Sequence, residues 1–202
     1  MSKRMVMPVL GLVGFMAVGF TAQTAVRADD DDKKTPDPVQ IRMRDFCDQR
    51  TFDLVAGPGT CIPIIGSGVP GMPFGFFFGE LLQDKSVGEW RFNPDRIEVE
   101  EGTKLILTNL GGETHTLTKV EKFGGGFVAP LNGPSGTPVP APECAQVLPD
   151  GSLAPQPESP DNQFVEALTT EQGPTIKGDE GTIRFQCCIH PWMRLVVKHK
   201  EH

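Results

Sequence analysis

Residues 185–193 read Phe185-Gln186-Cys187-Cys188-Ile189-His190-Pro191-Trp192-Met193. A thiolate, an imidazole and a thioether at the spacing Cys-x-x-His-x-x-Met are soft and borderline ligands, a set that suits copper better than magnesium, calcium or zinc. The thioether argues against a structural zinc site. Because this run supplies only three donors, a tight copper site needs at least one more histidine, and His115 is the candidate supplier.

The residues on either side of this run predict two β-strands. Ile183, Phe185 and Cys187 alternate with polar residues, which is the period-two pattern of a half-buried strand, so Cys187 is expected to face inward. Residues 193–198 are predicted to form the closing strand. The donors are therefore expected at the end of one strand, in the connecting loop and at the start of the next strand.

The preceding part of the chain predicts further short strands separated by turns. The expected strands are residues 90–92, 96–99, 104–109 and 115–120, with Asn, Pro, Asp and Gly between them. Many short strands and no convincing long helix indicate a sandwich or barrel. A Pro/Gly-rich insertion follows from about 123 to 181, within which residues 163–168 form a strand or a short helical turn. A loop of that length inside one domain is expected to be functional or tied down.

The N-terminus has the layout of a secretory signal. A basic start, an apolar middle and small residues ending at Ala28 predict a signal peptide over 1–28 with cleavage after Ala28; the alternative is a retained membrane anchor. Residues 29–40 carry charge and proline and predict a disordered acidic leader.

Residues 41–87 sustain neither helical nor strand periodicity and are predicted to be an irregular N-terminal extension. They contain a Gly/Pro/Phe-rich run at 68–79, with Phe74–Phe78 at its centre. This run either packs over one end or face of the core or forms an exposed apolar partner surface. Residues 88–202, with their insertion, are predicted to be the main domain.

Charge limits the possible partners. Removing residues 1–28 takes away Lys3, Arg4 and Arg27 but no acid, which leaves 16 basic and 26 acidic residues and a formal charge of −10. Binding of nucleic acid or anionic lipid needs clustered Lys and Arg, so both are disfavoured. A basic protein is the expected electrostatic partner. Export to an extracytoplasmic space such as the periplasm also permits disulfides.

With these residues, the sequence resembles the cupredoxins, the small blue copper proteins such as plastocyanin and amicyanin. The resemblance covers about 88–120 and 181–200, and the His-Pro-aromatic-Met ending of the loop is especially similar to amicyanin. In that family an upstream histidine follows an Asn-bearing strand, as His115 follows Asn109 here. The family often has Asn directly after this histidine, where this chain has Thr116.

The resemblance implies an all-β fold, a Greek-key β-sandwich or barrel of the cupredoxin type, with one type 1 copper ion. It implies that His115, Cys187 and His190 form the trigonal plane of ligands and that Met193 is the weak axial ligand. The solvent-side edge of His190, flanked by Pro191 and Trp192, is then the expected exit for the electron.

The remaining cysteines are expected to form disulfides. If Cys187 binds metal, four cysteines remain and allow three pairings. Alternation points Cys188 away from Cys187, to the outer face of the strand. We predict Cys47–Cys61 and Cys144–Cys188, the second of which would tie the insertion to the ligand-bearing strand.

These features predict a soluble one-electron carrier between redox proteins, monomeric and not an enzyme. The alternative is a copper-delivery protein in which redox cycling is incidental. Copper enzymes need further copper sites built mainly from histidine, and the chain has only two more, His199 and His202. Those two are predicted to lie in a solvated tail, with an adventitious metal site as the alternative.

Overall fold

The structure is a computed structural model that describes residues 35–66, 68, 70–178 and 181–200. The predicted signal peptide, residues 29–34 of the predicted leader, and His202 lie outside the described residues. All described residues belong to one unit of the chain, Lys34–His202. None of the helices in this part of the chain is both long enough and apolar enough to cross a membrane.

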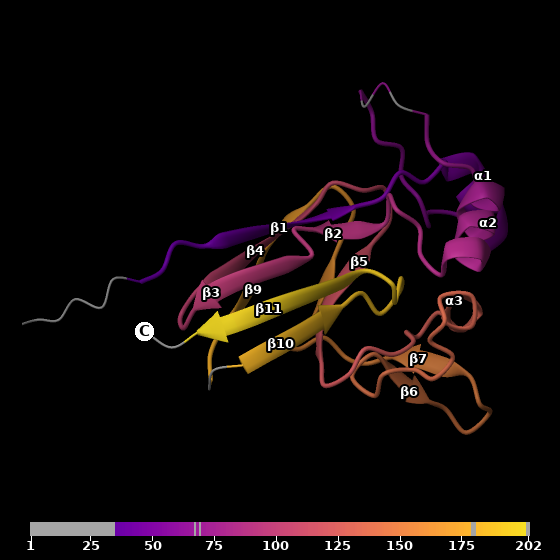
Figure 1. Ribbon diagram of the computed structural model, residues 1–202. Coiled ribbons are helices and arrows are strands. Elements are labelled where there is room, and N and C mark those ends of the chain that lie inside the picture. The colour runs from indigo at the N-terminus through magenta and orange to yellow at the C-terminus, as the bar shows by residue number, and fades with distance from the viewer. Residues whose placement is uncertain (1–34, 67, 69, 179–180, 201–202) are drawn as a thin grey trace, which may run out of the picture. The chain divides into compact units, whose positions relative to one another are not determined.

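Two β-sheets form a sandwich (Figure 1). The first sheet has the order β2-β1-β4-β9 and contains β1 (Val39–Arg44), β2 (Arg91–Asn93), β4 (Lys104–Asn109) and β9 (Thr170–Thr175). The second has the order β3-β11-β10-β5-β8 and contains β3 (Arg96–Glu100), β5 (His115–Val120), β8 (Asn162–Val165), β10 (Gly181–Gln186) and β11 (Arg194–Lys200). Strands β1 and β4 are parallel, as are β3 and β11, and the other pairs are antiparallel.

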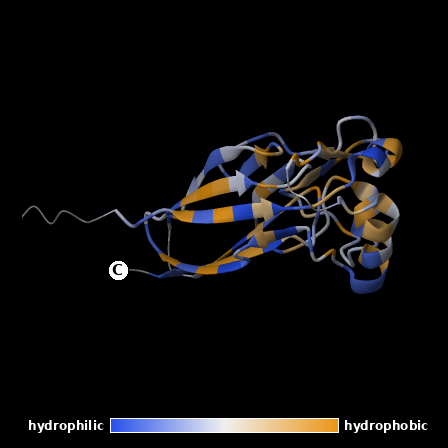
Figure 2. Ribbon diagram, turned by 90° about the horizontal axis from the view of Figure 1, so that it is seen from above, coloured by the Kyte–Doolittle hydropathy of each residue, from blue (hydrophilic) through white to orange (hydrophobic). Residues whose placement is uncertain are grey.

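Apolar side chains from both sheets meet in one core. Leu105 and Leu107 of β4 lie in the same buried cluster as Phe185 of β10 and Leu195 of β11. Figure 2 shows that hydrophobic and hydrophilic residues alternate along the strands. Successive side chains of a strand point to opposite faces of the sheet, so this alternation places the apolar side chains on one face. The predicted all-β sandwich is confirmed.

The predictions of a disordered leader up to residue 40 and of an irregular extension from residue 41 are wrong for residues 39–44. Val39–Arg44 form β1, which lies between β2 and β4 in the first sheet. The sheet therefore begins within the predicted leader and extension, before the predicted domain start at residue 88. The pattern was hard to see because β1 is short and alternates over only six residues, with Ile41 and Met43 buried.

The predicted extension also contains two helices, α1 (Gln49–Ala56) and α2 (Phe74–Asp84). Asp48 is the N-cap residue of helix α1, and its side chain accepts a hydrogen bond from the amide of Thr51. Helix α2 buries Phe77 and Leu81, which lie on one face because they are four residues apart. Glycines within the phenylalanine run lower its helix propensity and hid this pattern. The expectation that the run packs over one end of the core is confirmed for its buried face.

The insertion is shorter and more ordered than predicted. Strands β8 and β9, which fall within 123–181, pair with β5 and β4 and so belong to the two sheets. The expectation of a strand in 163–168 is confirmed by β8. The rest contains α3 (Ala129–Asn132) and a hairpin of β6 (Ala145–Val147) with β7 (Leu153–Pro155).

Both predicted disulfides are present. Cys47–Cys61 links the start of α1 to the loop that follows it, and Cys144–Cys188 ties the insertion to the residue after the proposed thiolate ligand. The amide of Phe127 also donates to the carbonyl of Cys188 at 2.9 Å. A side chain at Gly126 would overlap that carbonyl, so only glycine permits this close approach.

Candidate metal centre

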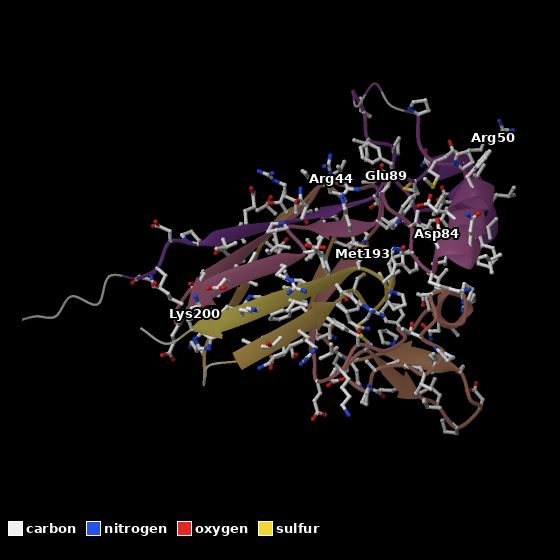
Figure 3. All side chains as sticks on the ribbon, viewed as in Figure 1. Arg44, Arg50, Asp84, Glu89, Met193 and Lys200 are labelled. Atoms are coloured by element: carbon white, nitrogen blue, oxygen red, sulfur yellow. A yellow bond between two sulfur atoms is a disulfide. The ribbon has the colours of Figure 1, made fainter. Side chains whose placement is uncertain are left out.

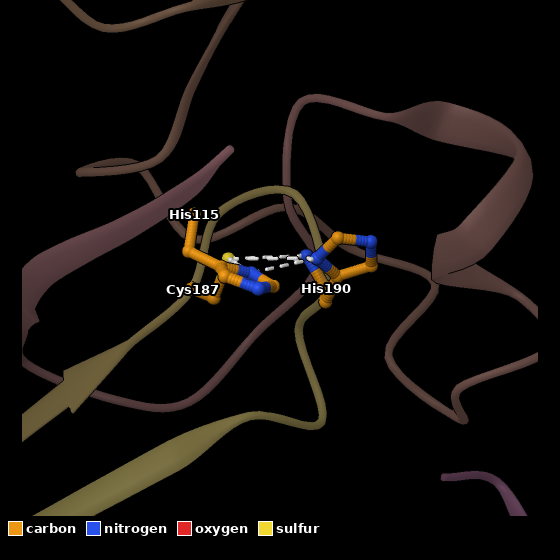
Figure 4. Close-up of side chains that lie close together, drawn as sticks. All are labelled: His115, Cys187 and His190. Carbon is orange, nitrogen blue, oxygen red and sulfur yellow. Dashed lines mark hydrogen bonds between the residues drawn. The ribbon is translucent and has the colours of Figure 1, made fainter. Parts of the chain in front are cut away.

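Three of the predicted ligands come together at one end of the sandwich (Figure 4). His115 is the first residue of β5, Cys187 directly follows β10, and His190 lies in the loop that leads to β11. Cys187 Sγ lies 3.8 Å from Nδ1 of His115 and 3.8 Å from Nδ1 of His190, and the two nitrogens are 3.3 Å apart. All three side chains are buried.

The spacing of these donors fits one metal ion. The point equidistant from the three atoms lies about 2.1 Å from each of them, against metal–nitrogen bonds of about 2.0–2.1 Å and metal–sulfur bonds of about 2.3 Å at zinc sites. Two imidazoles and one thiolate in a trigonal arrangement are also the donor set that blue copper sites use. The residues present therefore fit copper in chemistry and in size.

Met193 lies in the same loop, directly before β11 (Figure 3). Its carbonyl accepts a hydrogen bond from the Cys187 amide at 3.0 Å, and its own amide donates to the His190 carbonyl at 2.9 Å. These bonds close the loop from Cys187 to Met193 into a tight turn. The thioether is buried in the core cluster, and its role as an axial ligand stays a prediction.

The surroundings of Cys187 favour its thiolate form. The amides of Thr116 and His190 each approach Sγ at 3.4 Å. Burial raises the pKa of the thiol, but hydrogen bonding and attraction by His115 and His190 more than offset burial and hold this pKa well below its usual range. The thiolate is the form that binds metal, so Cys187 is already in the state that a metal ion requires.

Thr116 joins the two parts of the chain that carry ligands. Its hydroxyl accepts a hydrogen bond from the Cys188 amide at 2.7 Å, and it also lies 3.0 Å from the hydroxyl of Thr118. The side chain is fully buried. Thr116 therefore fixes the His115 strand to the Cys187 loop.

Each ligand imidazole faces a buried carboxylate on its far side. Nε2 of His115 lies 2.9 Å from Oδ2 of Asp45, and Nε2 of His190 lies 3.5 Å from Oε2 of Glu113. The same Glu113 oxygen accepts a 2.6 Å hydrogen bond from the indole N–H of Trp90. A carboxylate in this position orients the ring and makes it a more basic ligand.

Burial and pairing act differently on these ionisable groups. Burial raises the pKa of Asp45, but His115 and the amides of Gly112 and Glu113 outweigh it and the pKa is lowered. For Glu113 burial dominates over His190 and Trp90, and the pKa is raised. Burial lowers the pKa of His115, yet Asp45 and Cys187 raise it to about 10. The metal-free site thus contains a charged His115–Cys187 pair, in which a metal ion would take the place of the proton.

Sequence reasoning missed both carboxylates. Asp45 follows β1 and lies far from His115 in the sequence, so no local spacing connects the two. Glu113 stands two residues before His115 in Gly-Gly-Glu-Thr-His, and an acid so close to a proposed ligand was a weak signal that could have been used.

The predicted electron exit at an exposed edge of His190 is wrong. His190 is only 2% exposed, because Phe77 of α2 and Trp192 pack against its ring with centroid distances of 6.5 Å and 5.4 Å. Phe77 also contacts Trp90 at 4.8 Å and Phe52 of α1 at 5.2 Å. We call this group, Phe52, Phe77, Trp90 and Trp192, the aromatic cap.

The prediction for His199 is also wrong. His199 lies on β11 and its side chain is buried, so this residue is not part of a solvated tail. Leu195, Val197 and His199 alternate with exposed or half-buried residues, so the period-two pattern of this strand extends one step further than predicted.

Comparison with solved structures finds copper proteins. A purple cupredoxin from Nitrosopumilus maritimus aligns with a TM-score of 0.37 and 12% identity, covering 80% of this chain and 99% of that chain. A reduced amicyanin variant has a TM-score of 0.32 and 15% identity over 57% of this chain and 78% of its own. A copper-containing nitrite reductase from Thermus scotoductus SA-01 has a TM-score of 0.31 and 16% identity over 55% of this chain and 20% of its own.

No protein-family model and no curated protein matches the sequence. The TM-scores are low, so the assignment of the site depends on its own geometry. The chain has a cupredoxin-like β-sandwich in which one cysteine and two histidines meet at the end of the sheet that carries β5, β10 and β11.

Proposed function

We propose that this chain is an exported mononuclear copper protein that carries one electron at a time between redox partners. The observation that supports the proposal most is the spacing of the three donors, which fits a single first-row ion. His115, Cys187 and His190 would hold the ion in a trigonal plane, with Met193 as a weak axial ligand. Bound copper would supply the Cu(II)/Cu(I) couple.

The protein's own part in electron transfer is to keep the donors still. His115 is fixed by β5 and Asp45, and Cys187 by two amides that point at its sulfur. Little movement of the ligands between oxidation states favours fast electron exchange.

The burial of the site favours retention of copper over delivery. A delivery protein must present its donors to an acceptor, whereas Cys187 and His115 are fully buried and His190 lies under the aromatic cap. The two disulfides are in keeping with an oxidising, extracytoplasmic compartment.

The test is a visible and EPR spectrum of the copper-loaded protein, followed by voltammetry. We expect an intense thiolate-to-copper band towards the red, a narrow copper hyperfine splitting and reversible one-electron cycling with copper retained. A colourless protein would contradict the proposal. Ready transfer of Cu(I) to a chelator of ordinary affinity would favour the delivery alternative.

The outer face of α2 is the surface that we propose for the redox partner. A groove there is lined by Phe46, Met72 and Phe76 and bordered by the carboxylates of Glu80, Asp84 and Glu89. Phe76 is 73% exposed, while the next residue, Phe77, contacts His190 from the inner face of the same helix. An apolar surface with an acidic border fits a basic redox protein with an apolar contact region.

Asp84→Lys is expected to slow electron transfer to a basic c-type cytochrome about tenfold at low ionic strength, because like charges oppose the encounter. Stopped-flow rates over a range of salt concentrations measure this effect, which should vanish at high salt. The matched control is Glu101→Lys, which makes the same charge change in the turn between β3 and β4, at the opposite end of the sandwich (Figure 1). Equal slowing by both variants would contradict docking at α2.

A further inference from the structure

We infer that Asp45 is a positioning residue for the His115 ligand, and that its charge biases the site towards Cu(II) over Cu(I). The inference rests on the proposed function, because it concerns how the same three donors hold copper. It starts from a carboxylate that lies outside the donor set and is fully buried.

Asp45 is held by backbone amides as well as by His115. Its Oδ1 accepts from the amide of Gly112 at 2.8 Å and from the amide of Cys47 at 3.4 Å. Its Oδ2 accepts from the amide of Glu113 at 3.1 Å and lies 2.9 Å from Nε2 of His115. Each oxygen therefore has two N–H partners, and the carboxylate has no room to turn away from the ring.

This arrangement decides which nitrogen of His115 would face a bound metal ion. A carboxylate can only accept, so Nε2 of His115 carries the proton and donates it to Asp45. Nδ1 is then the nitrogen that faces Cys187 and His190, and a bound ion would take the place of its proton there.

The backbone around Asp45 is built for close approach. A side chain at Gly111 would overlap the Asp45 carboxylate, and one at Gly112 would overlap the carbonyl of Ile62. A side chain at Gly112 would also meet Sγ of Cys47 at 2.8 Å. The loop before His115 therefore packs closely against the segment after β1. The absence of side chains at two adjacent glycines leaves room for the Asp45 carboxylate and the Cys47–Cys61 disulfide.

The charge of Asp45 acts differently on the two oxidation states. Cu(II) carries one more positive charge than Cu(I), so a buried negative charge beyond the imidazole stabilises Cu(II) more. Burial strengthens this effect, because little water is present to screen it. Glu113 is the weaker counterpart, since its distance to Nε2 of His190 is 3.5 Å and it is shared with Trp90.

The test is Asp45→Asn, which keeps the shape and one acceptor oxygen but removes the charge. Competition with Cu(II) and Cu(I) chelators measures both dissociation constants, and voltammetry measures the potential. We expect the preference for Cu(II) over Cu(I) to fall at least tenfold, which corresponds to a rise of about 59 mV for a one-electron couple.

The matched control is Asp48→Asn, which removes one charge three residues away on the N-cap of α1 and keeps the capping oxygen. We expect its preference for Cu(II) to stay within about twofold of the unmodified protein. The inference would be overturned if Asp45→Asn weakened the binding of Cu(II) and Cu(I) equally, or if Asp48→Asn shifted the potential by the same amount. Asp45 would then have only a structural role.

A second measurement needs no variant. In the diamagnetic Cu(I)-loaded protein, long-range 1H–15N NMR should detect a slowly exchanging Nε2–H on His115. A proton on Nδ1, or rapid exchange at Nε2, would also overturn the inference.

If the unmodified protein shows no thiolate-to-copper band, the proposed function itself fails. If it shows the band but the potential does not respond to Asp45→Asn, only the role of Asp45 fails.

Discussion

Replacing Cys187 by serine is expected to abolish the visible colour of the copper-loaded protein and to weaken copper binding strongly. The thiolate is the only anionic sulfur within reach of both His115 and His190 among the described residues. A serine hydroxyl stays protonated and is a hard donor, so the thiolate-to-copper charge-transfer band should be lost and copper should be bound more weakly. The visible spectrum and a competition titration with a chelator measure the two effects.

The adjacent cysteine provides the control. The double variant Cys144→Ala with Cys188→Ala removes the disulfide of the insertion but leaves the Cys187 thiolate in place. It should keep the band, although closure of a 44-residue loop predicts a loss of stability of about 4 kcal/mol. Colour that persists in Cys187→Ser, or that disappears only in the double variant, would contradict the assignment of the thiolate.

The second large effect is expected for Phe77→Ala. Phe77 is the centre of the aromatic cap and is almost completely buried against Phe52, Trp90 and Trp192. Truncation of a buried phenylalanine leaves a cavity and destabilises a protein by about 3–5 kcal/mol. Because the cap covers His190, the variant should also let small ligands such as azide reach the copper and change its spectrum.

Phe76→Ala is the matched control, since Phe76 is the neighbouring residue of the same helix and points outward. Its stability should stay within about 0.5 kcal/mol of the unmodified protein, as for other surface substitutions. Urea unfolding of the metal-free proteins measures both changes. Similar losses in the two variants would mean that α2 contributes as a whole and that the cap does not depend on Phe77.

The convergence of the three proposed ligands could be predicted from sequence because two of them lie close together in the chain. Cys187 and His190 lie in one short loop next to an alternating strand, and the chemistry of that loop required one more histidine. His115 was the candidate on an upstream strand. The structure brings these three side chains together. The same alternation turns Cys188 away from the site, which leaves it available for the disulfide that it forms with Cys144.

The supporting residues could not be predicted in this way. Asp45 meets His115 only because β1 pairs with β4 and carries the chain to the end of the sandwich. That contact is a property of the sheet order, which no local pattern encodes. Helix α2 was missed for a different reason, because its glycines and consecutive phenylalanines obscure the i, i+4 spacing of Phe77 and Leu81.

The most direct test of the copper site is X-ray absorption at the copper K-edge of the loaded protein. The structure predicts one sulfur and two imidazole nitrogens in the first shell, at distances within about 2.3 Å. The sulfur contribution should vanish in Cys187→Ser. A first shell of nitrogen and oxygen alone, in the unmodified protein, would contradict a shared ion among His115, Cys187 and His190.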